Sequence, residues 1–346
     1  MNLEIRKMRP EEATATKQVA IKAFGVFWHL IPAPEDAMVA ILDGQIVGGF
    51  IYKIKTAGKK KTGMVSWFFT HPDVQGKGIG RQLGDAGLKQ MWDEGCDVIT
   101  TFVRDDNVAS WIAFVKQGFV RGTVSALVGE LGLSGFLNLA AYWFSPIHDF
   151  YIVKKDGKVK EKRNGPGQAA IFTLLNLLLL LLAVRNFSQD ALRVAGSLLF
   201  VLVGGTLAGG IGALFSRERK WGVRMTTGGV GISLLVSVLL RNFFPVFAGW
   251  YPAQYEHTPK FKRDMALVAI CSWLFYIAVI ALVKVELLPA AAGIASMLLV
   301  IRCIPIASLG SHGGERVWQW SKPLFLVLTV ASVLLMWLSG TLFFWV

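Results

Sequence analysis

The sequence predicts two parts of different fold class. The first is an α/β (α+β) domain, a mixed sheet with helices on both faces, and the second is an all-α transmembrane bundle of about six helices. Charge distinguishes them, because residues 1–166 contain 22 Lys and Arg and 17 Asp and Glu, whereas residues 167–346 contain 14 and 6. Patterning agrees, since strand-like and helix-like segments alternate in the first part and long apolar runs dominate the second.

The composition of the whole chain excludes several classes of protein. Hydrophobic residues make up 53% of the 346 residues and charged residues 17%, which rules out a disordered chain, a collagen-like chain and an enzyme that is water-soluble along its whole length. The net charge of +13 fits Lys and Arg at the cytoplasmic ends of membrane helices better than a nucleic acid partner, which is not expected. Three scattered cysteines without a CxxC predict neither a disulfide framework nor a metal site, and no signal peptide is expected.

Within residues 1–156, hydrophobic periodicity and turn residues assign each element in order. Asp43-Gly44 separates two β-rich runs and predicts a hairpin. The expected strands are 3–8, 38–42, 45–55, 63–71, 97–103, 119–127 and 149–154, and the expected helices are 10–30, 79–94 and 107–117. This order predicts a mixed sheet that is covered on both faces.

A glycine-rich stretch, residues 71–81 (HPDVQGKGIGR), joins a buried strand to an amphipathic helix. Glycines at 76, 78 and 80 permit a tight turn, after which the free amides at the helix N-terminus point at one spot and suit a pyrophosphate. Lys77 and Arg81 add positive charge. The stretch is neither a P-loop, which ends in GK[ST], nor a dinucleotide fingerprint, which follows the first strand of a βαβ unit. On its own the pattern also fits a flexible turn.

Two blocks at this spacing resemble the GNAT acetyltransferase family. The sequence QGKGIG at 75–80 matches the family's Q/R-x-x-G-x-G/A signature, preceded by the typical His71-Pro72. The second block is Asn107, Ser110, Phe114 and Gly118-Phe119. The resemblance extends to the element order over residues 1–156 and implies acetyl-CoA as co-substrate. The residues that it places at the CoA are Phe69, Thr70, Gln75, Gly76, Lys77, Gly78, Ile79, Gly80, Arg81, Asn107, Ser110 and Phe114.

The same resemblance implies direct acyl transfer, in which an amine attacks the thioester while the backbone at Phe69–Thr70, splayed from the neighbouring strand, polarises its carbonyl. The sequence departs from the family in its catalytic groups. Phe114 stands where the family often has a Tyr that acts as the general acid, and residues 66–70 offer no carboxylate base. Catalytic residues are therefore not assigned. The candidates are His29, His71 and Asp73, with packing as the alternative role of His29 and a structural role as that of His71.

Residues 131–146 form a nearly uncharged insertion before the last strand. It either packs on the sheet or the spans, or lies at a membrane interface with Tyr142 and Trp143 at headgroup depth, where lipid is the partner. A basic linker, residues 157–166, follows and leads into the transmembrane domain, 167–346.

Hydropathy places six membrane spans in that domain. They lie near 167–184, 190–214, 225–248, 264–283, 287–309 and 323–346. Basic clusters before the first span and between the second and third predict a cytoplasmic N-terminal domain, but Lys260, Lys262 and Arg263 then fall outside. If the third segment, broken at Arg241–Pro245, does not cross, five spans remain.

Polar and small residues within the spans have two interpretations each. Glycines at 204, 205, 209, 210 and 212 indicate close helix packing or a ligand path. Arg241 and Arg302 lie toward segment ends, which favours snorkelling to the interface over an interior site.

Segments 242–252 and 304–322 resemble site-two-type intramembrane metalloproteases. Those enzymes need HExxH to hold zinc, and none of the five histidines here is followed by Glu. The resemblance therefore implies a domain without protease activity and without a metal.

The sequence thus predicts an integral, multi-pass membrane protein whose cytoplasmic domain transfers an acetyl group from acetyl-CoA to an unidentified amine. The alternative is a non-catalytic acyl-CoA sensor that regulates a membrane transporter or scaffold.

Overall fold

The computed structural model describes most of the chain in two compact units. The described residues are 2–25, 29, 33–57, 60–104, 108–122, 124–137, 148–159, 165–183, 189–216, 220–225, 230–241, 243–252, 259–282, 287–288, 290–304 and 313–342. Unit 1 comprises Met1–Val103, Ala109–Leu139 and Phe150–Lys162, and unit 2 comprises Arg104–Val108, Ala140–Asp149 and Arg163–Val346.

The sheet of the N-terminal part has seven strands in the order β1-β2-β3-β4-β5-β7-β6, with β4 and β5 parallel. The strands are β1 Leu3–Lys7, β2 Ala37–Leu42, β3 Gln45–Ala57, β4 Lys60–Thr70, β5 Val98–Arg104, β6 Val120–Arg121 and β7 His148–Lys154. The helices are η1 Pro10–Glu12, α1 Ala13–Phe24, η3 Pro72–Val74, α2 Ile79–Asp93, α3 Val108–Lys116 and α4 Val124–Leu137.

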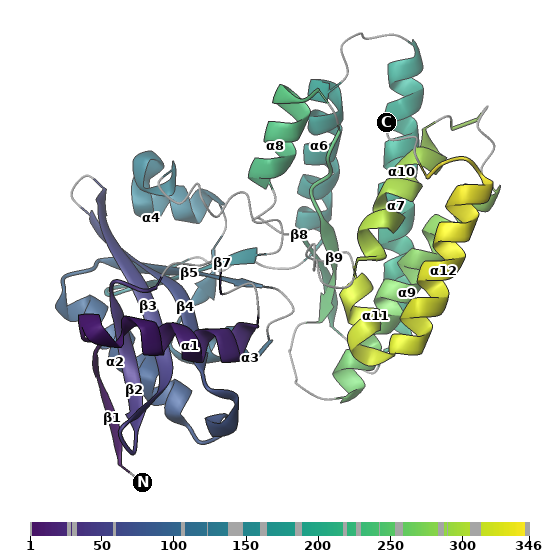
Figure 1. Ribbon diagram of the computed structural model, residues 1–346. Helices are drawn as coiled ribbons and strands as arrows, with labels where there is room; N and C mark the ends of the chain where they lie inside the picture. Colours follow the sequence, from purple (N-terminus) through teal and green to yellow (C-terminus); the bar gives the residue numbers. More distant parts are fainter. Residues whose placement is uncertain are drawn as a thin grey trace. The chain divides into compact units, whose positions relative to one another are not determined.

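Alternation along the strands produces two cores, one on each face of the sheet. Helices α1 and α2 lie on opposite faces of this sheet (Figure 1). In β2, Met38 and Ala40 join the core under α2 and α3, whereas Val39 and Ile41 join the core under α1. Period-two alternation sends successive side chains to opposite faces, so a strand that is apolar on both faces must be covered on both. The predicted mixed sheet with helices on both faces is confirmed.

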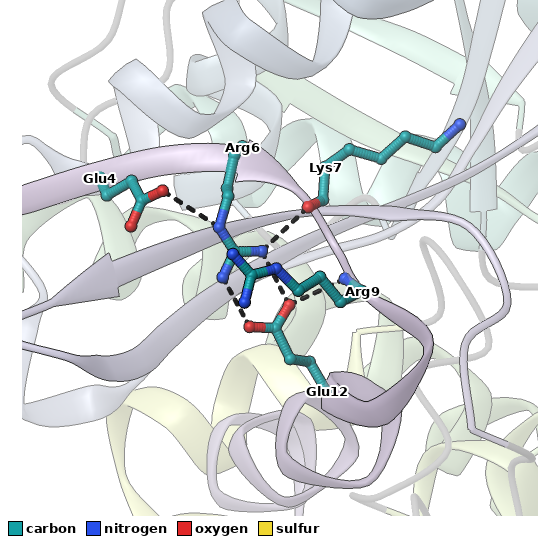
Figure 2. Close-up of polar contacts among 5 residues, drawn as sticks. All are labelled: Glu4, Arg6, Lys7, Arg9 and Glu12. Carbon is teal, nitrogen blue, oxygen red and sulfur yellow. Dashed lines mark hydrogen bonds and ion pairs between the residues drawn. The ribbon is translucent and has the colours of Figure 1, made fainter.

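An ion pair fixes the entry to the first helix (Figure 2). Both Nη atoms of Arg6 donate to Glu12, at 2.8 and 2.6 Å, and the backbone amide of Arg9 donates to the same carboxylate at 2.8 Å. Glu4 accepts a further bond from Arg6 Nε at 3.1 Å. The hydrogen bonds from Arg6 lower the pKa of Glu12 to about 2.

Several element boundaries differ from expectation in this part. The hairpin at Asp43-Gly44 is confirmed, with positive φ at both residues. The expected helix 10–30 ends at Phe24, because Gly25 adopts φ 89°. The expected strand 119–127 was wrong in extent: β6 covers Val120–Arg121, the amide of Gly122 still donates to Phe150 of β7 at 3.0 Å, and α4 begins at Val124.

Helix α4 contains the start of the expected insertion 131–146. The helix is kinked at Gly132 (φ 68°), and it buries Leu131 and Phe136 while leaving Leu133 exposed. Residues 138–147, which include Tyr142 and Trp143, lie outside the described part of the chain.

Unit 2 is mainly helical. Its elements are α6 Pro166–Ala183, α7 Gln189–Leu214, β8 Trp221–Met225, α8 Val230–Leu239, β9 Ala248–Pro252, α9 Pro259–Leu282, α10 Ala291–Arg302, α11 Gly314–Trp320 and α12 Lys322–Leu338. Among the described residues, three helices, α6, α7 and α9, are long and apolar enough to cross a membrane. α10 and α12 are apolar but shorter, so a bundle of six spans is not confirmed.

The segment 225–248, expected as one span, is divided. Helix α8 covers only ten residues and ends at Leu239, Arg241 has φ 53°, and β9 begins at Ala248. β9 returns to pair with β8 in a two-stranded antiparallel sheet, the β8–β9 sheet. Hydropathy alone could not detect this break, because all of these pieces are apolar.

Glycines bring α7 and α9 into close contact. A Cβ at Gly212 would lie 2.7 Å from the carbonyl oxygen of Leu267 and from the Cα of Val268. A Cβ at Gly204 would overlap the ring of Phe275. As α7 runs from 204 to 212, its contacts on α9 run from 275 back to 267, so the helices are antiparallel. The close-packing interpretation of these glycines is confirmed.

Candidate functional site

The candidate site lies where two parallel strands part. Parallel pairing joins Thr62–Val65 of β4 to Val98–Thr101 of β5. β4 continues beyond this register to Thr70, and on its other side Phe69 and Thr70 pair with Gly49 and Gly48 of β3. The carboxyl end of β4 thus diverges from β5, and in sheets of this kind ligands bind outside the carboxyl ends of strands.

The loop after β4 carries backbone amides that lack acceptors. Gly76 and Gly78 have φ 78° and 77°, and Gly78 is the N-cap of α2 without a side-chain capping bond. Within the described part of the chain, nothing accepts a hydrogen bond from the amides of residues 76–81. A Cβ at Gly76 or Gly78 would meet no atom within 4 Å. Open space and converging donors at a helix N-terminus are the requirements of a phosphate site.

The charges predicted for this loop are in place. Gln75, Lys77 and Arg81 are exposed, and the side chain of Arg81 lies 3.9 Å from Asp85 one turn further along α2. Ile79 is buried and anchors the start of α2 in the core. The loop therefore has a fixed apolar base and a cationic outer face.

Sequence analysis missed Gly48 and Gly49 of β3, a glycine pair that lies against the end of β4. A Cβ at Gly48 would lie 3.0 Å from the carbonyl oxygen of Phe69, and one at Gly49 would overlap the Phe69 ring. On the loop side, a Cβ at Gly80 would lie 3.6 Å from Thr70. Two adjacent glycines inside a strand signal close approach by another backbone, and this signal was present in the sequence.

The second sequence block contributes a buried aromatic. Phe114 on α3 is 3% exposed, and its ring lies 5.7 Å from Phe68 and 5.1 Å from Phe119 between centroids. Phe68 in turn belongs to β4, so α3 packs on the strand whose end forms the site. Ser110 is half-buried one turn before Phe114. Asn107 lies outside the described residues.

The candidate acid and base groups are only partly brought to the site. His71 caps the short helix η3, where its Nδ1 accepts a bond from the amide of Asp73 at 3.3 Å. Its own amide donates to Val47 at 2.7 Å. The Asp73 side chain is 85% exposed. His29 is exposed, and its carbonyl accepts a bond from Lys17 at 3.1 Å. These contacts indicate a structural use of His71.

No group of three or more His, Cys, Asp or Glu residues that could hold a metal ion occurs among the described residues. His257 and His312 lie outside them.

Comparison with known proteins agrees with this geometry. Residues 3–119 match the model of the acetyltransferase (GNAT) family. The mycothiol acetyltransferase of Paenarthrobacter aurescens (strain TC1) is 30% identical over 101 residues, which cover 28% of this chain and 31% of that protein. The mycothiol acetyltransferase of Streptomyces coelicolor (strain A3(2)) is 29% identical over 87 residues, or 25% and 28% of the two chains. The chain thus spans about a third of the length of these curated relatives.

Solved structures to which this chain is similar include Ard1 from Thermoplasma volcanium, at 18% identity over 45% of this chain and 99% of that chain, with a TM-score of 0.33. A GNAT family acetyltransferase from Brucella melitensis in complex with acetyl-CoA is 19% identical over 47% and 94%, with a TM-score of 0.31. The family match ends at residue 119 and gives no support to the metalloprotease resemblance of unit 2. Residues 3–119 of this chain are thus similar in sequence to the acetyltransferase (GNAT) family.

Proposed function

We propose that this protein is a membrane-anchored N-acetyltransferase that moves an acetyl group from acetyl-CoA to an amine. The observation that carries the proposal is the set of acceptor-free amides at residues 76–81 beside the diverging end of β4. The family match over residues 3–119 supports the same reaction class.

The loop residues suit the pyrophosphate of acetyl-CoA. The amides from Gly76 to Arg81 are donors, open space surrounds Gly76 and Gly78, and Lys77 and Arg81 supply positive charge. The backbone at Phe69–Thr70 would take the pantetheine arm, because β5 leaves this edge of β4. Gln75, Ile79, Gly80, Ser110, Phe114 and Asn107 complete the proposed CoA site.

The reaction needs little from the side chains. The amine attacks the thioester carbonyl carbon, the C–S bond breaks, the thiolate of CoA leaves, and the proton lost by the amine balances the thiolate. A backbone amide at the end of β4 would stabilise the developing oxyanion, which is worth several kcal/mol. Since Phe114 carries no hydroxyl, protonation of the leaving thiolate falls to water or the substrate.

Three long apolar helices support membrane anchoring. The amide of Gly165, just before α6, donates to Val223 of β8 at 2.9 Å, so α6 begins beside the β8–β9 sheet. The chain passes through this sheet between the end of α7 and the start of α9, because β8 follows α7 and β9 precedes α9. Among the described residues, Lys220 after α7, Arg224 on β8, and Lys260, Lys262 and Arg263 at the start of α9 therefore lie toward one end of unit 2. The positive-inside rule assigns this end, and with it the acetyltransferase domain, to the cytoplasm.

Titration of the full chain in detergent tests the proposal. We expect heat on adding acetyl-CoA, and thiol release when an amine panel that includes amino sugars, peptides and aminolipids is added. Absence of both at millimolar acetyl-CoA would remove the proposal.

One observation favours a second function, a non-catalytic acyl-CoA sensor. Phe114 is buried between Phe68 and Phe119, and β4 offers no carboxylate from Ser66 to Thr70. Phe114→Tyr distinguishes the two functions, because a phenol near the thiolate would speed an existing transfer by about a hundredfold or less but would not create one in a sensor. Binding without thiol release in both the wild type and Phe114→Tyr would establish the sensor.

A further inference from the structure

Unit 2 contains a pocket whose charged residues are all positive. It is lined by α6, α7, α9, α10, α11, β9 and the segment before β9, and its polar lining includes Thr206, Trp250, Ser272, Tyr276, Arg302 and Arg316. The interior measures about 30 Å³, enough for about two water molecules or one small oxyanion group. None of the lining residues is acidic.

Arg302, the last residue of α10, does not snorkel. It is 4% exposed, and the acceptors that it contacts among the described residues are neutral. Its Nη1 donates to the carbonyl of Ala269 at 3.0 Å and its Nη2 to the hydroxyl of Ser272 at 3.1 Å. The guanidinium also lies 5.1 Å from the ring centre of Tyr276. Its buried Nε has no acceptor among the described residues.

Arg316 on α11 is held in a similar way. Its Nη1 donates to the carbonyl of Trp250 at 3.2 Å, and its guanidinium lies 4.5 Å from the ring centre of Tyr251. Its buried Nη2 has no acceptor in the described part of the chain. By contrast, Arg263 at the start of α9 has the carboxylate of Asp264 at 2.9 Å.

The buried guanidinium of Arg302 and the half-buried guanidinium of Arg316 at one pocket are costly without an anion. An uncompensated buried charge costs several kcal/mol, and two of the same sign also repel each other. Each still has a buried N–H group to donate, and the planar guanidinium matches the oxygens of carboxylate or phosphate.

We propose that this pocket binds a small oxyanion, a phosphate or carboxylate group, between Arg302 and Arg316. Two sources offer this chemistry, namely the headgroup of an anionic lipid and a free anion from water. The narrow interior admits the charged group alone, so a larger ligand would leave the rest of its body outside.

The experiment uses the full chain. In detergent, thermal unfolding and calorimetry are measured with sodium phosphate against sodium chloride at constant ionic strength. In nanodiscs, unfolding is measured in phosphatidylglycerol and in phosphatidylcholine. The variants are Arg302→Gln and Arg316→Gln, and the control is Arg193→Gln, which removes the same charge from an exposed position on α7.

We expect the wild type and Arg193→Gln to be stabilised by phosphate or by phosphatidylglycerol. Each pocket variant should weaken that response by about tenfold or more in anion affinity, the size of one charge-assisted hydrogen bond. A response to phosphate identifies a free anion as the source, and a response to phosphatidylglycerol alone identifies a headgroup.

Two results would overturn the proposal. One is a wild type that is indifferent to both anions, which means that the arginines find their partner within the chain. The other is an anion response that Arg316→Gln retains in full, which means that the anion binds elsewhere. Arg316 is less buried than Arg302, so its variant keeps the test decisive if Arg302→Gln does not fold.

Discussion

Glycine has opposite roles in the two units. In the loop after β4, Gly76 and Gly78 have positive φ and open space around them. In α7, Gly204 and Gly212 are helical, and any Cβ would collide with α9. The first pair is needed for its backbone conformation, and the second pair for the absence of a side chain. Similar glycine-rich strings, GKGIG and GGIG, thus predict different consequences of substitution.

The largest effect is expected at Gly212. Gly212→Ala places a methyl group against the backbone of α9, which cannot rotate away, and should destabilise unit 2 by about 3 kcal/mol. Unfolding of the full chain in detergent measures this. The matched control is Gly196→Ala on the same helix, where nothing lies within 4 Å. Equal stability of the two variants would contradict the close contact.

Gly78 should show a smaller effect on stability and a specific one on binding. Gly78→Ala forces an L-residue to φ 77° and should cost about 1–2 kcal/mol. Gly44→Ala, in the β2–β3 turn at φ 84°, should cost about the same. Only Gly78→Ala should weaken acetyl-CoA binding, by about tenfold or more, because it redirects the loop amides. Equal acetyl-CoA affinity of both variants, measured by calorimetry, would show that the loop does not bind CoA.

These cases show what the sequence could reveal and what it could not. The conformation of residues 75–80 is local, so the motif was sufficient to predict it. The break in 225–248 was indicated by Arg241 and Pro245, but the path of the chain after it was not predictable, because each piece is apolar and pairing of β8 with β9 decides that path. The pocket was likewise hidden, since Arg302 and Arg316 come from separate segments, and proximity to a segment end misleadingly suggested that Arg302 snorkels.

Acid should affect the units differently. Glu12 has its pKa lowered to about 2 by Arg6, so its ion pair stabilises β1 and α1 above pH 4.5 and is lost as the pH falls toward 2. The expected loss is about 1 kcal/mol, since water reaches the pair. The protection factors of β1 and α1 amides, which are their exchange rates corrected for the intrinsic effect of pH, should fall over this range, while those of α7 should not. Glu12→Gln should remove the pH dependence and Glu11→Gln should preserve it; if both behave alike, the ion pair is irrelevant.

Gly63 refines the comparison, because it is a glycine of β4 that is needed for space. A Cβ there would lie 3.1 Å from the sulfur of Cys96. Burial raises the pKa of the Cys96 thiol to about 11, so we expect no labelling of Cys96 by iodoacetamide at pH 8 in the folded chain. Peptide mapping by mass spectrometry measures this, with the urea-unfolded chain as control. Labelling as fast as in urea would show that the position is open.

The β8–β9 sheet affects how α9 responds to the membrane potential. By returning the chain to the end of unit 2 from which α7 emerges, it places Lys260, Lys262 and Arg263 beside that end. In the proposed membrane orientation, inverting α9 would drive these charges against a negative-inside potential, at about 2.3 kcal/mol for each charge per 100 mV. The membrane voltage would then oppose inversion of α9 after its insertion.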